Sequence, residues 1–276
     1  MNQRDNMNQQ GNGPRRPRTD RDRDRARGDR ARGDRPRTDR PRQDPRRQPL
    51  DPARRAAFDT LRAVTERDSY ANLALPALLA ERGITGRDAA FATELTYGTC
   101  RTRGQLDDII AAAANRPVAD IDPILLDLLR LGAYQLLRTR VEPHAALDTT
   151  VSAAKNEFDS VRGGFVNAVL RNISTRDLDG WIAELAPDRA TDPIGNLAFA
   201  HAHPRWIAQA FADTLGAEAA ELPAVLAADD ARPQVHLAAR PGVLTAAELA
   251  EQTGGTLGRY SPYAVYLPGG DPGQIA

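Results

Sequence analysis

The spacing of apolar residues between positions 51 and 173 constrains the fold more than any other feature. In the segment Phe165–Ile173 they stand at 165, 166, 169, 170 and 173. A second segment also has helical spacing, with apolar residues three or four positions apart at 147, 151, 154 and 158. Residues three and four positions apart share one face of an α-helix. This part of the chain therefore predicts packed amphipathic helices.

Seven helices are expected, and two of them have clear start signals. Asp51-Pro52 and Asp122-Pro123 each place an N-cap residue before a proline at the first helical position. Pro76 is expected to kink or restart the second helix. The expected helices lie at about residues 52–64, 70–79, 85–98, 105–114, 123–136, 144–158 and 165–173. Together they predict one helical domain at 51–175.

The pattern changes in the last third of the chain. Helical spacing continues less regularly over 177–185 and 194–226. Apolar residues then alternate with polar ones from Val235 to Ala239, and a second strand is expected over Tyr263–Leu267. Thr245–Gln252 between them predicts a capped helix. The predicted fold class is mainly α, a seven-helix bundle followed by a small mixed α/β domain at 176–276.

The net charge of zero hides two oppositely charged parts. Residues 1–50 contain 16 Arg and 8 Asp, a net charge of +8, which leaves −8 for the rest of the chain. No large apolar residue except methionine precedes Leu50, so residues 1–48 predict a disordered arm. The arm could contact RNA phosphates without sequence preference, or serve only as a solubilising tail whose opposite charges largely cancel.

The composition excludes several classes of protein. Cys100 is the only cysteine, so no disulfide framework exists and a reducing compartment is expected. The N-terminus has no apolar signal segment, and no run of 18 apolar residues occurs, so we expect a cytoplasmic protein without a membrane span. His201 and His203 diverge on a helix and have no further ligands nearby, so we expect no metal site.

Four segments in a fixed order resemble the all-helical NusB-like RNA-binding domain: Tyr97–Arg101, Leu106–Ile110, Leu128–Leu137 and Phe165–Ile173. Two later segments, His203–Trp206 and Ser261–Val265, resemble the linker domain of the bacterial 16S ribosomal RNA cytosine-C5 methyltransferases of the RsmB/Sun type. In that family a NusB-like domain and a small linker domain precede the catalytic domain.

The resemblance implies a function for the chain. It would be the RNA-binding N-terminal portion of an S-adenosylmethionine-dependent 16S rRNA cytosine-C5 methyltransferase, acting as a monomer on 16S rRNA. The family needs a glycine-rich loop for S-adenosylmethionine and a nucleophilic cysteine, and neither motif is present here. Cys100 is expected to be a buried, inert thiol. We therefore expect no catalytic residue and no cofactor in this chain, with S-adenosylmethionine used by the full-length family member.

The resemblance also places a basic RNA-contacting surface on the first helix, which transfers to Arg54, Arg55 and Arg62. The alternative is a solvated helix face, the usual role of such charges. Asn167 and Arg171 are expected to make polar contacts between helices. The 14 aromatic residues show no alternating pattern along one strand, so base stacking on a sheet is not indicated.

Two other functions remain open from the sequence. A stand-alone transcription antitermination factor of the NusB type explains residues 51–175 equally well, but it leaves about 100 later residues without a role. A protein-interaction module is compatible with an acidic helical body, and a salt-dependent affinity for RNA would argue against it.

Overall fold

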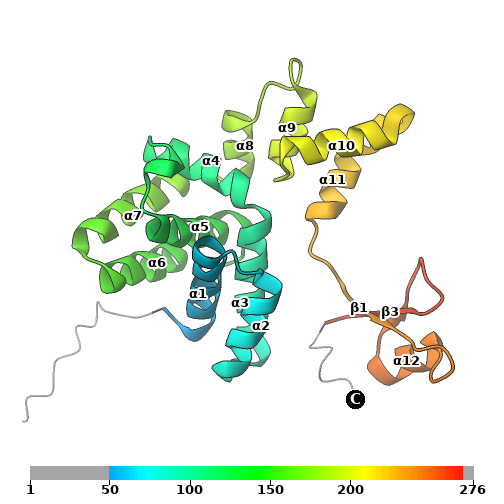
Figure 1. The fold of residues 1–276 in the computed structure, drawn as a ribbon. Helices are drawn as coiled ribbons and strands as arrows, with labels where there is room; N and C mark the ends of the chain where they lie inside the picture. Colours follow the sequence, from blue (N-terminus) through cyan, green and yellow to red (C-terminus); the bar gives the residue numbers. More distant parts are fainter. Residues whose placement is uncertain (1–49, 270–276) are drawn as a thin grey trace, which may run out of the picture. The chain divides into compact units, whose positions relative to one another are not determined.

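The structure is a computed structural model, and it describes residues 50–269. The prediction of a disordered arm at 1–48 lies outside the described residues. Within them the fold is mainly helical with one small sheet (Figure 1), which confirms the predicted fold class.

Seven α-helices occupy the first half of the described chain, as the sequence predicted. They are α1 (Pro52–Arg67), α2 (Ala71–Glu81), α3 (Gly86–Arg101), α4 (Arg103–Ala114), α5 (Pro123–Arg138), α6 (Pro143–Glu157) and α7 (Ser160–Ile173), with a short 3₁₀ turn η1 (Val118–Asp120) before α5. The two Asp-Pro starts are confirmed, because Asp51 accepts from the Arg54 N–H and Asp122 accepts from the Ile124 N–H. These bonds satisfy amide groups that the first helical turn leaves free.

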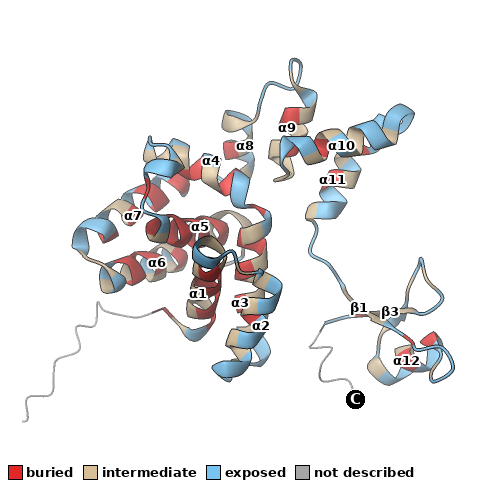
Figure 2. Cartoon of the chain, viewed as in Figure 1, coloured by how far each residue is buried: buried red, intermediate tan, exposed pale blue. Residues whose placement is uncertain are grey.

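Helix α5 is the centre of this domain. Residues 125–135 are buried without a break, and α1, α3, α4, α6 and α7 all contact the helix (Figure 2). The close approach of α3 requires Gly98, because a Cβ there would lie 1.9 Å from the Tyr134 hydroxyl oxygen. A helix that is apolar nearly all round is expected to be covered on every side.

The expected restart of the second helix at Pro76 is not observed. Pro76 does not restart the helix, which runs unbroken from Ala71 to Glu81. Only Leu75 is fully buried in it, while Tyr70 and Leu73 are exposed. Few neighbours surround α2, so the lost amide donor of Pro76 can be accommodated at the surface.

Short helices follow the seven-helix domain: α8 (Leu178–Leu185), α9 (Pro193–Ala200), α10 (Arg205–Leu215), the 3₁₀ segment η2 (Gly216–Glu221) and α11 (Leu222–Asp230). Trp181 of α8 is buried, and its indole N–H donates to the Ile173 carbonyl at 3.0 Å. Helices α9–α11 have a core of their own, built on Ala198, Ala208 and Leu226.

The last described part is a small antiparallel sheet with one helix. Strands β1 (Val235–Ala238), β2 (Thr256–Leu257) and β3 (Ala264–Leu267) are ordered β1-β3-β2, and α12 (Ala246–Thr253) lies between β1 and β2 in sequence. The two predicted strands and the capped helix are present. The two-residue β2 was not predicted, because it is too short for an alternating pattern to be visible.

Candidate RNA-binding surface on the first helix

Helix α1 carries the three arginines that the sequence analysis selected. Its buried face is formed mainly by small residues such as Ala53, Ala56 and Ala57. Arg54, Arg55 and Arg62 flank this face and are neither fully buried nor fully exposed. The hydrogen-bond and ion-pair partners of each guanidinium determine whether it can contact an external anion.

Arg54 is held within the protein on three sides. Its Nη1 donates to Asp51 Oδ2 and its Nε to Gln135 Oε1, both at 2.6 Å. The guanidinium carbon also lies 5.0 Å from the centre of the Phe91 ring, a cation–π contact. The side chain is 13% exposed. This arginine therefore joins α1 to α3 and α5.

Arg62 belongs to a buried network of charges. Its Nη1 donates to Asp127 Oδ2 at 2.9 Å, and Asp127 is only 1% exposed. The other oxygen of Asp127 accepts from Thr65 at 3.0 Å and from Arg130 at 2.8 Å. Arg130 completes the network with a two-pronged contact to Asp107 at 2.6 and 2.7 Å. Arg62 also pairs with the more exposed Glu66 one turn along α1, so this network of opposite charges joins α1, α4 and α5.

Arg55 is the most accessible of the three, with 37% of its side chain exposed. It pairs with Glu157 of α6 at 2.5 Å and more loosely with Asp59 at 3.7 Å. Asp59 also accepts from Arg82 of α2 at 2.7 Å. Exposed pairs of this kind contribute little to stability and exchange readily with other anions.

The structure therefore separates the three arginines. All have acidic partners, but Arg54 and Arg62 are largely enclosed, whereas Arg55 faces solvent. The prediction that all three contact RNA remains a prediction. A signal for the structural role was present in the sequence: Asp127 and Arg130 interrupt the otherwise apolar stripe of α5, and charges at such positions need buried partners.

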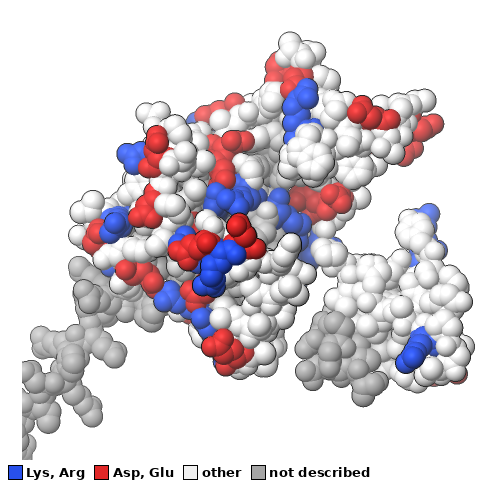
Figure 3. Space-filling model, in the orientation of Figure 1, with Lys and Arg blue, Asp and Glu red and all other residues white. Residues whose placement is uncertain are grey.

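Other polar residues on α3, α4 and α7 differ in their partners. Arg103 pairs with Asp107 at 4.0 Å, whereas Arg101 has no ion pair with the described residues. The expectation for Asn167 and Arg171 is wrong, because they bond to each other along α7 and Arg171 is exposed. Figure 3 shows basic and acidic side chains intermixed over the helical part of the face drawn.

Cys100 is the other potentially reactive group that the sequence analysis named. Cys100 is half-buried at the end of α3, and burial is the main cause that raises the pKa of its thiol. A raised pKa keeps the sulfur in its less nucleophilic form. No group of three or more His, Cys, Asp or Glu in the described chain could hold a metal ion. No described helix is long and apolar enough to cross a membrane.

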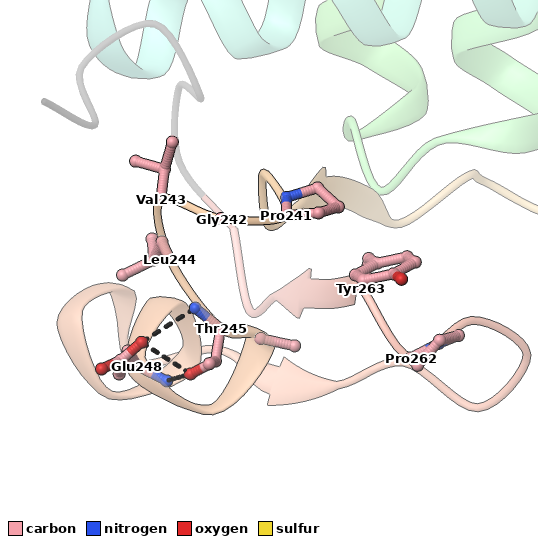
Figure 4. Close-up of a pocket in the computed structure, with 9 residues that line it drawn as sticks. Pro241, Gly242, Val243, Leu244, Thr245, Glu248, Pro262 and Tyr263 are labelled. Atoms are coloured by element: carbon pink, nitrogen blue, oxygen red, sulfur yellow. Dashed lines mark hydrogen bonds between the residues drawn. The ribbon is translucent and has the colours of Figure 1, made fainter.

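One cavity of about 440 Å³ lies in the small sheet domain (Figure 4). It is lined by residues 241–246, Glu248, Pro262 and Tyr263. The Glu248 carboxylate accepts from the Thr245 N–H at 2.8 Å and from the Thr245 hydroxyl at 2.7 Å. These bonds cap α12 and, by stabilising the ionised carboxylate, hold the pKa of Glu248 below its ordinary value. The carboxylate therefore has a structural role.

Comparison with known proteins defines the class of the helical domain. Residues 51–175 match the NusB family. A Mycobacterium tuberculosis protein named "Putative methyltransferase Rv1407" is 73% identical over 231 residues, which are 84% of this chain and 50% of that protein. "Ribosomal RNA small subunit methyltransferase B" of Pseudomonas putida is 33% identical over 157 residues, 57% of this chain and 34% of that protein.

A solved structure supports the same fold. The crystal structure of PH0851 covers 82% of this chain and 50% of its own, with a TM-score of 0.56 and 14% sequence identity. Residues 51–175 are thus a NusB-family domain, and the homologues of the chain include proteins named ribosomal RNA small subunit methyltransferase B. The matches confirm the resemblance predicted from the sequence. The chain spans about half the length of the M. tuberculosis relative.

Proposed function

We propose that this chain is the RNA-binding N-terminal portion of an S-adenosylmethionine-dependent methyltransferase that modifies cytosine C5 of 16S rRNA. The observation that carries the proposal is a NusB-family domain at residues 51–175 in a chain whose relatives are named small-subunit rRNA methyltransferases. The whole protein would be cytoplasmic, and the chain would bind RNA as a monomer.

The division of labour follows from the groups present. Methylation at cytosine C5 uses a thiolate nucleophile that attacks C6 and a bound S-adenosylmethionine that supplies the methyl group. The Cys100 thiol is half-buried on a helix with a raised pKa, which is a poor setting for a nucleophile. This chain would therefore contribute RNA binding and leave cofactor binding and chemistry to the rest of the protein.

The contact surface on α1 is proposed to centre on Arg55. A phosphate can replace Glu157 and Asp59 as the partner of an exposed guanidinium at little cost. Arg54 and Arg62 would support the surface chiefly by fixing α1 against α5 through Gln135 and Asp127. The basic segment before α1 would add phosphate contacts without sequence choice.

Two measurements on the purified chain test the proposal. Fluorescence anisotropy with a panel of 16S rRNA hairpins should show binding that weakens as salt rises, because neutralised phosphates release counterions. Titration calorimetry with S-adenosylmethionine should show no stoichiometric complex. Affinity for none of the hairpins would refute the RNA-binding role, and a stoichiometric cofactor complex would refute the division of labour.

A further inference from the structure

The small sheet has one face covered by α12 and one face that α12 leaves open. Val265 of β3 packs against Ala239, Ala246 and Leu249 in the core on the α12 side. Successive residues of a strand point to opposite faces. His236, Tyr266 and Thr256 therefore lie together on the other face, which is called the open face here.

An aromatic pair occupies the middle of the open face. The register of β1 and β3 sets His236 opposite Tyr266, and their ring centres are 4.6 Å apart in an edge-to-face arrangement. His236 Nδ1 lies 2.7 Å from the Gln234 carbonyl oxygen. The Tyr266 hydroxyl accepts from the Arg259 backbone N–H at 3.1 Å. These contacts fix the His236 Nδ1 atom and the Tyr266 hydroxyl group, and they thereby orient both rings.

Two arginines stand beyond this pair at one end of the sheet. Arg240 follows β1, and Arg259 follows β2. The small residues Ala238 and Ala264 lie between them and the aromatic pair, in register on neighbouring strands. Next to Arg259, Tyr260 is 84% exposed, with the guanidinium 5.3 Å from its ring centre.

Basic and acidic residues of this domain lie on different elements. Arg240 and Arg259 are exposed and have no ion pair with any residue in 50–269. Glu248 and Glu251 lie on α12, which covers the opposite face, and Glu248 is occupied by its cap. The contrast with α1 is direct, because all three selected arginines there have carboxylate partners. Unpaired guanidiniums next to aromatic side chains are suited to a ligand that has both negative charges and planar aromatic rings.

We propose that the open face binds a single-stranded RNA segment, with a base stacked against the His236–Tyr266 pair and phosphates held by Arg240 and Arg259. Stacking on aromatic rings combined with backbone contacts from cations is the general way in which proteins bind unpaired nucleotides. The choice of RNA rests on the proposed function. The site shares no residue with α1 and would bind unpaired nucleotides.

The test uses the full chain and two labelled oligonucleotides of equal length, a single-stranded RNA octamer and the same octamer with abasic sites. Wild type should bind the normal octamer about tenfold more tightly than the abasic one, since stacking depends on the bases. The H236A/Y266L variant should lose this preference. The R240E/R259E variant should weaken binding of both octamers by about tenfold, and Y266F, which keeps the ring, should retain the preference.

Controls separate this site from the helical domain and from misfolding. Arg189 lies outside the sheet domain, is exposed and has no ion pair with the described residues. Arg189→Glu should therefore leave the affinities for both octamers unchanged. Unchanged octamer binding in R240E/R259E, or a loss of the base preference in Y266F equal to that in H236A/Y266L, would overturn the proposal. So would tight binding of a protein partner to the open face in place of RNA. If wild type binds the 16S hairpins but shows no preference for bases, this proposal fails while the proposed function stands.

Discussion

Replacement of Arg62 by alanine should destabilise the helical domain much more than replacement of Arg55. Arg62 is 12% exposed and donates to Asp127, which is 1% exposed. Removing one partner of a buried ion pair costs about 3–5 kcal/mol. Asp127 would keep Arg130 and Thr65 as donors, so we expect the lower end, about 3 kcal/mol. For Arg55→Ala, which breaks exposed pairs, we expect less than about 1 kcal/mol.

Thermal unfolding followed by circular dichroism measures the difference. A loss of about 3 kcal/mol should lower the Tm of a domain of this size by roughly 10 °C, and the Arg55 variant should melt within about 3 °C of wild type. In RNA binding, Arg55→Ala alone should flatten the salt dependence, by about 0.7 in log–log slope for one lost phosphate contact. If Arg62→Ala melts like wild type yet loses RNA affinity, the structural assignment of Arg62 is refuted.

Three further predictions concern other parts of the chain. Gly98→Ala should destabilise by about 1–3 kcal/mol in urea unfolding, because the new methyl group would overlap Tyr134; a stable variant would contradict the close packing of α3 on α5. Thr245→Ala should cost about 1 kcal/mol at pH 7 by removing an N-cap. The depressed pKa of Glu248 means that its stabilising effect is present above its ordinary value of 4.5 and lost as pH falls through the lower folded value. The difference between the Thr245 variant and wild type should therefore narrow in acid melts without vanishing, because the Thr245 hydroxyl also accepts from the Glu248 N–H at any pH. Cys100 should react with a disulfide reagent more slowly than a free thiol at pH 8 and at the free-thiol rate after unfolding, since burial raises its pKa.

The helices were predictable because their signals are local. The start at Asp51-Pro52 and the spacing within α7 each depend on residues fewer than ten positions apart. Pro76 shows where a local rule fails: its effect on α2 depends on how few neighbours surround the helix, which no local pattern records. The same limit applies to Arg171, whose exposed position on α7 follows from the packing of the whole bundle.

The candidate site was less predictable because the sequence shows charges without their partners. Arg54, Arg55 and Arg62 look equivalent on a helix drawn from the sequence. Their partners stand far along the chain: Gln135 is 81 positions from Arg54, Glu157 is 102 from Arg55, and Asp127 is 65 from Arg62. Only the packing of the helices, with α1 against α5, assigns these partners and with them the different exposures.

The open face of the sheet was also not predictable from the sequence. No aromatic residues alternate along one strand of the sequence, so no local pattern marks this face. His236 and Tyr266 belong to different strands, 30 positions apart, and only the antiparallel register makes them neighbours. Arg240 and Arg259 likewise lie at the same end of the sheet because β1 and β2 both pair with β3. A count of arginines would have favoured α1 as the RNA-binding surface. The three selected guanidiniums of α1 have carboxylate partners, whereas Arg240 and Arg259 beside the sheet have none among the described residues, so the sheet end is a second surface that can meet phosphates.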